Sequence, residues 1–343
     1  MGLEQHICVL CGSAFLGTDL ICRLCRLKHP EWDVTKMAPE DVPPPPIPTQ
    51  KEKVRDQYLE RLTHEEIPFP TGKVTIPTKE DRDYRATIVL TTPDIGGENF
   101  RFCKYRLDKH TPGEHRLIVV ETHFNEKPYN YARDINIGLR GVQDSDYLIM
   151  LNDDIFVEQG WLDTMVECAR QDPKIGIVGA LLFYPGKRII QHAGGLYDTS
   201  VESWVKHGTM PVKHSYGGLP LKYSKHGVYT QKDVPWNTGA LLLVTKACID
   251  KSGLMDEKLV AHCDDVEYNF RAWLNGFRVV YCPDVQAIHR ENVTRKHGTK
   301  ESPQYIFDAL RHLLQVLPKK KADKVQDAVD KSNKKHYPVL DEQ

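Results

Sequence analysis

Short apolar runs alternate with amphipathic segments between residues 84 and 290 of this chain. Apolar runs of this length predict buried strands, and they lie at residues 86–90, 117–120, 147–151, 175–182 and 239–245. Apolar positions at helical spacing predict helices at 130–140, 160–170 and 266–274. Strands that alternate with helices favour a mostly parallel sheet with helices on both faces. The predicted fold class is therefore α/β.

Polar residues follow two of the predicted strands. Asn152, Asp153 and Asp154 come directly after one strand, and Glu121 ends another. Because ligands bind at the carboxyl ends of parallel strands, these side chains are expected to line one crevice. Carboxylates suit Mg²⁺ or Mn²⁺, which are often shared with substrate phosphates. A solvated turn with an Asp helix cap is the alternative interpretation of the triplet.

A second acidic cluster begins the predicted helix at 266–274. Asp264 or Asp265 is expected at its N-cap, where a carboxylate satisfies free N–H groups. The cap explains one acid of the Asp264-Asp265-Val266-Glu267 segment but not all three. An Asp aimed into a cleft could take a proton from an attacking hydroxyl. Further along, His289 follows a strand, as a structural histidine or as a metal ligand beside Asp154.

The first 36 residues carry two Cys-x₂-Cys pairs, Cys8 with Cys11 and Cys22 with Cys25. Thiolates at this spacing close tetrahedral Zn²⁺ sites, and so short a segment buries too little apolar surface to fold alone. We predict a zinc-ribbon-like module with structural Zn²⁺. Disulfides or a redox Cys-x₂-Cys are the alternatives. The module's role is structural or protein-docking, or else it contacts nucleic acid through the basic residues near its second pair.

Composition shifts divide the rest of the chain. A Pro-rich linker and a short helix are predicted at 37–83, the α/β domain at 84–300, and a basic helical tail at 301–343. Residues 195–235 hold few apolar runs and predict a loop-rich insertion over the binding crevice.

The overall charge does not by itself suggest a nucleic-acid or membrane partner. Lys and Arg number 46 against 47 Asp and Glu, giving a net charge of −1. No run of about 18 apolar residues predicts a membrane span, and the first residues lack a secretory pattern. We therefore expect a cytoplasmic protein, the cytoplasm of a phage-infected host included. No pattern in the chain fixes an oligomeric state.

Several segments together resemble the family 2 glycosyltransferases, which have the GT-A fold, a Rossmann-like α/β architecture. The resemblance covers roughly residues 86–295. The order and spacing of the matching segments are together more specific than any one segment. The segments that carry it are Asn136-Ile137-Gly138-Leu139, 147–154, 177–180, 190–195, 237–240, 253–257, 264–267 and 276–289.

The resemblance implies roles for the acidic residues. Asp154 matches the last acid of the DxD-type motif that binds the divalent metal, Mn²⁺ or Mg²⁺, and His289 matches a histidine that completes the metal shell. Asp265 matches the catalytic base. Asn152 departs from a strict DxD motif.

The resemblance also implies a nucleotide-sugar site. Glu121 stands where the family usually has an Asp that reads the nucleobase, so a uridine donor is expected. The remaining donor-site residues are Thr92, Pro93, Asp94, Asn136 and Asp153.

The implied activity is metal-dependent, inverting transfer of a hexose or pentose from a nucleotide-sugar to an acceptor hydroxyl. A macromolecular acceptor is expected, with modified bases in DNA as one candidate because the tail is basic. Cytoplasmic glycan, glycolipid or protein glycosylation is the alternative. Two further alternatives come from other classes. One is a non-catalytic zinc adaptor with a degenerate transferase domain, and the other is a nucleotidyltransferase.

Overall fold

The computed structural model describes residues 4–7, 14–17, 82–121, 130–141, 144–186, 189–207, 210–221, 227–260, 263–290 and 303–338. The chain divides into two compact units, Met1–Arg61 and Leu62–Gln343. In the first unit, strands β1 (Glu4–Ile7) and β2 (Ala14–Gly17) form an antiparallel pair.

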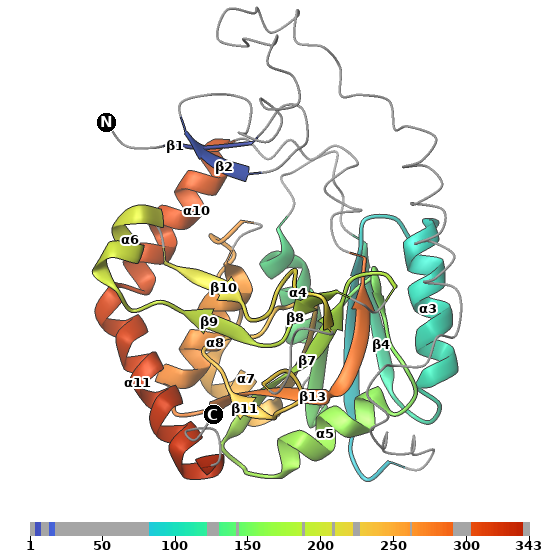
Figure 1. Ribbon diagram of the computed structural model, residues 1–343. Helices are drawn as coiled ribbons and strands as arrows, with labels where there is room; N and C mark the ends of the chain where they lie inside the picture. The colour runs from blue at the N-terminus through green and yellow to red at the C-terminus, as the bar shows by residue number, and fades with distance from the viewer. Residues whose placement is uncertain are drawn as a thin grey trace, which may run out of the picture. The chain divides into compact units, whose positions relative to one another are not determined.

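A central sheet organises the second unit (Figure 1). Its strands follow the order β11-β13-β7-β12-β5-β3-β4, with β6 on β13 and β8 on β7. The bounds are β3 Ala86–Thr92, β4 Arg116–Glu121, β5 Tyr147–Asn152, β6 Ile155–Phe156, β7 Ile175–Phe183, β8 Ile190–His192, β11 Lys232–Asp233, β12 Leu241–Thr245 and β13 Arg278–His289.

Most strands along this path run in one direction. Parallel pairing joins β4, β3 and β5, and also β7 and β13, whereas β12 and β11 run the opposite way. The mostly parallel α/β sheet is confirmed. The antiparallel β12 in its middle was not foreseen, because a run of Leu and Val carries no signal of strand direction.

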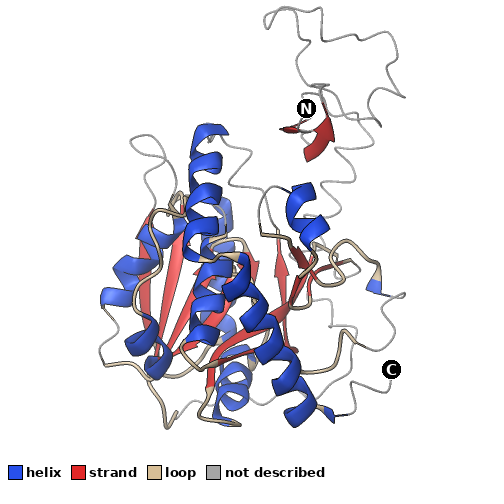
Figure 2. Ribbon diagram, turned by 90° about the vertical axis from the view of Figure 1, so that its left-hand side faces the viewer, coloured by secondary structure: helices blue, strands red, loops and turns tan. Residues whose placement is uncertain are grey.

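Helices cover both faces of the sheet. On one face, α3 (Glu98–His110) and α5 (Trp161–Arg170) bury apolar side chains with Ile88 and Leu90. On the other, buried residues pack around Val89 from α4 (Tyr131–Arg140), α7 (Lys246–Ser252), α8 (Asp264–Leu274), α10 (Pro303–Val316) and α11 (Lys319–His336). Figure 2 shows several of these helices stacked in front of the sheet.

The predicted basic tail is part of this core. Leu313, Leu317, Val325 and Val329 are buried in the same cluster as the sheet residues. Asn333 also exchanges two hydrogen bonds with the backbone of Asp233, donating from its side-chain amide to the Asp233 carbonyl. The C-terminal helices therefore stabilise the sheet edge at β11.

The insertion at 195–235 contains more regular structure than expected. Strands β9 (Gly195–Tyr197) and β10 (Val212–His214) pair antiparallel, and α6 spans Val201–His207. These elements were missed because each is short, and short elements depend on packing more than on periodicity. Among the described residues, none of the helices has the length and apolar character needed to cross a bilayer.

Helix α4 approaches β3 closely at Gly138. A Cβ atom there would lie 2.2 Å from Val89 Cγ2, and Val89 is fully buried. We expect Gly138→Ala to lower the free energy of unfolding by about 1–2 kcal/mol, because overpacking outweighs the better helix propensity of Ala. Urea denaturation measures this.

Gly141→Ala is the matched control, since a Cβ atom there meets its nearest neighbours at 3.4 Å, an ordinary contact. Equal stability of the two variants would contradict the close approach of α4 to β3.

Candidate active site

The edge where the parallel strands end gathers the acidic residues. Thr92 and Glu121 are register partners at the ends of β3 and β4, and Thr91 is the partner of Asn152 at the end of β5. His289 ends β13, which runs in the same direction. The expected convergence of Glu121 and the Asn152-Asp153-Asp154 triplet on one edge is confirmed.

Asp153 and Asp154 are both buried, with exposed fractions of 4 % and 5 %. Thr92 donates its hydroxyl to Asp153 Oδ2 over 2.7 Å. Burial, and next the adjacent charge of Asp154, raises the pKa of the Asp153 carboxyl to about 7, while the Thr92 hydrogen bond acts the other way. This is a carboxylate pair that favours a cation or a proton beside it.

His289 lies against Asp154. Its Nε2 is 3.2 Å from Asp154 Oδ1, and both side chains are almost fully buried. The contact lacks hydrogen-bond geometry, and Asp154 Oδ1 has no hydrogen-bond partner. The backbone carbonyl of Asp154 accepts the Arg290 N–H, which fixes the main chain of both elements.

This pair fits a divalent cation. Two ligands at right angles on an octahedral ion, each at about 2.1 Å, are about 3.0 Å apart. A carboxylate oxygen without a hydrogen bond and an imidazole nitrogen at 3.2 Å match that spacing. Within the described part of the chain, no group of three or more His, Cys, Asp or Glu residues could hold a metal. A cation here would therefore take further ligands from substrate or water.

Asp265 lies in the first turn of α8 and is half-buried. Its Oδ2 accepts the Gly239 N–H at 2.9 Å, and its Oδ1 accepts the Val266 N–H at 2.7 Å. Both bonds fix the orientation of the carboxylate at the edge of the loop before β12.

The expected N-cap, Asp264 or Asp265, is wrong. The cap is Cys263, in a left-handed conformation with φ of 60°, and Asp264 and Asp265 are the first helical residues. The carboxylates still accept N–H groups of the first turn, but Asp265 also turns outward to Gly239. A left-handed non-glycine residue costs about 1–3 kcal/mol and is typical of functional sites.

The backbone of Gly239 and Ala240 joins the two acidic motifs. Gly239 binds Asp265 through its N–H, and the Ala240 carbonyl accepts the Asn152 N–H at 3.0 Å. The Tyr131 hydroxyl donates to the Gly239 carbonyl at 2.5 Å, and a Cβ atom on Gly239 would lie 3.0 Å from that ring. The Asp265 carboxylate and the strand end that precedes Asp153 and Asp154 therefore both bond the backbone of one turn.

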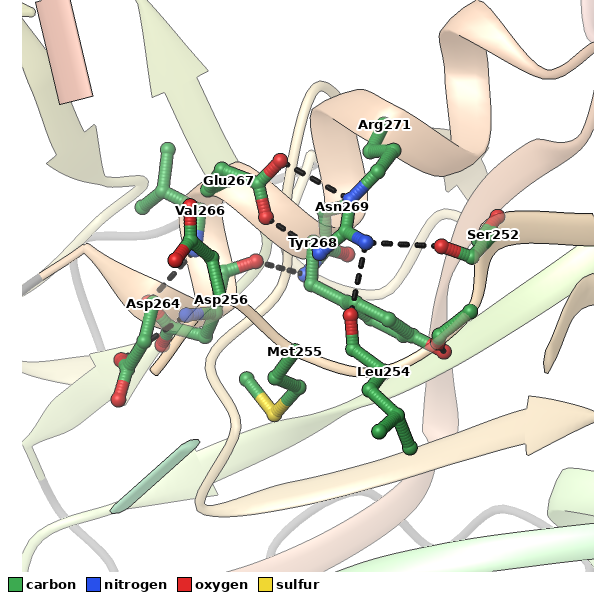
Figure 3. A network of polar contacts seen from close by, with 12 residues as sticks. Ser252, Leu254, Met255, Asp256, Asp264, Val266, Glu267, Tyr268, Asn269 and Arg271 are labelled. Atoms are coloured by element: carbon green, nitrogen blue, oxygen red, sulfur yellow. Dashed lines mark hydrogen bonds and ion pairs between the residues drawn. The ribbon is translucent and has the colours of Figure 1, made fainter. Parts of the chain in front are cut away.

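A polar network supports the start of α8 (Figure 3). Arg271 forms a two-armed ion pair with Glu267 and donates to the carbonyls of Ser252 and Leu254. Burial raises the pKa of Glu267, and the Arg271 charge opposes this rise. The network ties helix α8 to the preceding loop, and so it restrains the segment that carries Asp265.

The expected donor-site residues form a loop at the ends of β3 and β4. Pro93 is partly exposed and Asp94 is exposed beside the buried Thr92. Glu121 Oε1 accepts the Ile95 N–H at 3.1 Å, and Asp94 Oδ1 accepts the Gly96 N–H at 2.8 Å. The acidic side chains thus shape this loop at the sheet edge.

Asn136 sits deeper than the other expected donor contacts. Its side chain is fully buried, donates to the Met255 carbonyl and to Glu257 Oε1, and accepts the Met255 N–H. In this structure it fixes the 255–257 loop against α4. Its contact with a nucleotide sugar stays a prediction.

Three site residues were given no role from the sequence: Tyr131, Gly239 and Gln191. The segments 190–195 and 237–240 carried the family resemblance, and that was the only signal for the last two. The cysteines that were expected to bind Zn²⁺, Cys8, Cys11, Cys22 and Cys25, lie outside the described residues.

Residues 108–314 match the family model described as "Glycosyltransferase like family 2". The chain belongs to this family. The match spans the Asp154 and His289 pair, Asp265 and the turn between them, and it begins after β3 and the Thr92 loop.

Curated relatives of this glycosyltransferase include two named rhamnosyltransferases. The N-acetylglucosaminyl-diphospho-decaprenol L-rhamnosyltransferase of Mycobacterium tuberculosis is 25% identical over 185 residues, covering 49% of this chain and 56% of the relative. Rhamnosyltransferase WbbL of Escherichia coli is 25% identical over 167 residues, covering 47% and 61%. Uncharacterized protein y4gI of Sinorhizobium fredii is 27% identical over 175 residues, covering 50% and 18%. The alignments thus span less than two thirds of each relative.

Among solved structures, Staphylococcus aureus TarS has a TM-score of 0.46 at 11% identity, covering 74% of this chain and 44% of that one. GalNAc-T7 with UDP, GalNAc and Mn²⁺ has a TM-score of 0.45 at 16% identity, covering 61% and 44%. At these scores the likenesses support no conclusion about chemistry.

Because the pKa of Asp153 is raised, we expect the free energy of unfolding of the metal-free glycosyltransferase to depend on pH through this residue. The native carboxyl binds its proton up to pH about 7, whereas an unfolded Asp loses it near pH 3.9. The native state therefore holds more protons in this window, so the Asp153 contribution to the free energy of unfolding falls as pH rises from about 4 to about 7. Asp153→Asn removes this dependence, and we expect it to gain stability relative to wild type across that window.

Urea denaturation in EDTA at several pH values measures the difference. Asp108→Asn, which removes an exposed carboxylate of α3, is the control. A stability difference for Asp153→Asn that is flat with pH would contradict the assignment.

Proposed function

We propose that this protein is a metal-dependent, inverting glycosyltransferase that moves a sugar from a nucleotide-sugar to an acceptor hydroxyl. The observation that carries the proposal is the Gly239-Ala240 turn, with the Asp265 carboxylate bound on one side and the strand end leading to Asp154 and His289 on the other. The Asp154 and His289 pair suits a cation that binds the diphosphate of a donor, and the Asp265 carboxylate suits a general base. Single-displacement transfer needs both within one site.

In this proposal Asp265 accepts the proton of the acceptor hydroxyl as that oxygen bonds to the anomeric carbon. The bond from that carbon to the diphosphate breaks on the opposite face, so the configuration inverts. Asp154 and His289 would hold a Mn²⁺ or Mg²⁺ ion, which supplies Lewis-acid stabilisation of the diphosphate charge. The Thr92–Asp94 loop and Glu121 border the nucleotide, with uridine as the expected base.

The acceptor we favour is a sugar hydroxyl of a glycan or lipid-linked saccharide. Support comes from the name of the mycobacterial relative, which places its rhamnosyl transfer on an N-acetylglucosaminyl-diphospho-decaprenol. Modified bases in DNA are the second candidate, because α11 exposes lysines 320, 321, 324, 331, 334 and 335. For the Cys8, Cys11, Cys22 and Cys25 segment we propose a structural Zn²⁺ site, on the spacing of those cysteines alone.

Two substitutions separate the proposed roles of the carboxylates. We expect Asp265→Asn to lower turnover about 10²–10⁴-fold, the usual contribution of a general base, with donor binding nearly unchanged. Asp154→Ala should instead remove the Mn²⁺-dependent gain in affinity for the donor's nucleoside diphosphate. Calorimetric titration with and without Mn²⁺, alongside turnover, distinguishes the two, and each variant serves as the control of the other.

Wild-type turnover in Asp265→Asn would refute the base assignment. A metal titration curve of Asp154→Ala that superimposes on wild type would refute the ligand assignment.

The acceptor is tested by mass spectrometry of reactions with Mn²⁺, a panel of nucleotide-sugars, and either polyprenyl-diphosphate saccharides or hydroxymethylated DNA. We expect one sugar mass added to the saccharide. A sugar mass on DNA alone would establish the second candidate and reject the first. Donor hydrolysis with neither acceptor labelled would retain the transferase chemistry and reject both acceptors.

A further inference from the structure

Gln191 contacts His289 from the side opposite to Asp154, through the other nitrogen of the imidazole ring. It lies in β8, which pairs antiparallel with the end of β7, while β13 pairs with the same end of β7 in parallel. The side chain is buried, and its Oε1 lies 2.8 Å from Nδ1 of His289. No role for Gln191 follows from the motifs quoted for the family or from the proposed reaction.

The chemistry of this contact selects one tautomer of a neutral His289. A side-chain carbonyl oxygen only accepts hydrogen bonds, so Nδ1 of His289 must donate. In a neutral imidazole the other nitrogen then carries a lone pair. That nitrogen, Nε2, is the atom 3.2 Å from the unbonded Asp154 Oδ1. Two electron-pair donors thus approach one another in a buried place, as two ligands of one cation do.

We propose that Gln191 is a positioning residue that holds His289 as the Nδ1–H tautomer and so presents its Nε2 to the divalent cation. The inference rests on the proposed function in that it takes His289 as a cation ligand. Groups that orient metal-binding histidines in this way typically change metal affinity by about 10–100-fold when removed.

The choice of an amide over a carboxylate also has an electrostatic reason. Asp153 and Asp154 already place two acidic side chains at this buried edge. Gln191 orients the imidazole with a neutral acceptor and adds no third charge.

Mn²⁺ binding tests the proposal without any turnover. Free Mn²⁺ is measured by electron paramagnetic resonance during titration of the full chain with Mn²⁺ alone. We expect Gln191→Leu to weaken binding about 10–100-fold. Gln191→Glu keeps an acceptor for Nδ1–H and should bind no more than about threefold more weakly than wild type, a loss under about 1 kcal/mol, since its added negative charge can only favour the cation. Gln326→Leu, which removes a glutamine of α11 that bonds Asp330, is the control and should match wild type.

The tautomer of His289 gives a second readout on metal-free protein. Its ¹⁵N chemical shifts should report Nδ1–H in wild type and Gln191→Glu, and a shift toward the other tautomer in Gln191→Leu. The chemical shifts report the tautomer, and thermal unfolding of each variant records any loss of packing. The two measurements together separate a tautomer effect from a packing effect.

Wild-type Mn²⁺ affinity in a folded Gln191→Leu protein, or Nε2–H in wild-type His289, would overturn this inference and leave the proposed function standing. Absence of Mn²⁺ binding by the wild-type protein would overturn the proposed metal dependence together with this inference. Weakened binding by Gln191→Leu with rescue by Gln191→Glu would establish it.

Discussion

The site is built around two adjacent carboxylates that are buried at the end of a central strand. Burial, and next the adjacent charge of Asp154, raises the pKa of the Asp153 carboxyl, so an ionised Asp153 is costly there. The Thr92 hydroxyl donates a hydrogen bond to Asp153, whereas His289 lies against Asp154 without a hydrogen bond to it. One oxygen of Asp154 is still left without a hydrogen bond. A divalent cation is the group that would satisfy this arrangement.

The second constraint is the close approach of three elements at the turn before β12. Gly239 accommodates the Tyr131 ring on one side and the Asp265 carboxylate on the other, where a larger residue would crowd both. Asn269 reinforces the turn by bonding the backbone of Asn237 and of Asp265. The Asp265 carboxylate at the start of α8 is thereby held beside the turn that also bonds the end of β5.

Much of the fold could be predicted from the residues alone. The expected strands and helices agree with β3, β4, α4, β5, α5, β7 and α8 to within about two residues, because each pairs a continuous apolar run or a helical apolar stripe with clear polar ends. The N-cap of α8 was misplaced because capping preference favours Asp. The structure instead uses Cys263 and sends Asp265 toward Gly239.

By itself the sequence determined the α/β class, the strands that end in Glu121 and Asn152, and the residue types suited to a cation and a general base. These follow from local patterns of apolar and acidic residues. Only the tertiary structure decided which of them meet. His289 reaches Asp154 because β13 runs parallel to β7 and ends at the same edge, and Gln191 reaches His289 because β8 pairs with the end of β7. Such contacts depend on strand order and direction, which local sequence does not encode.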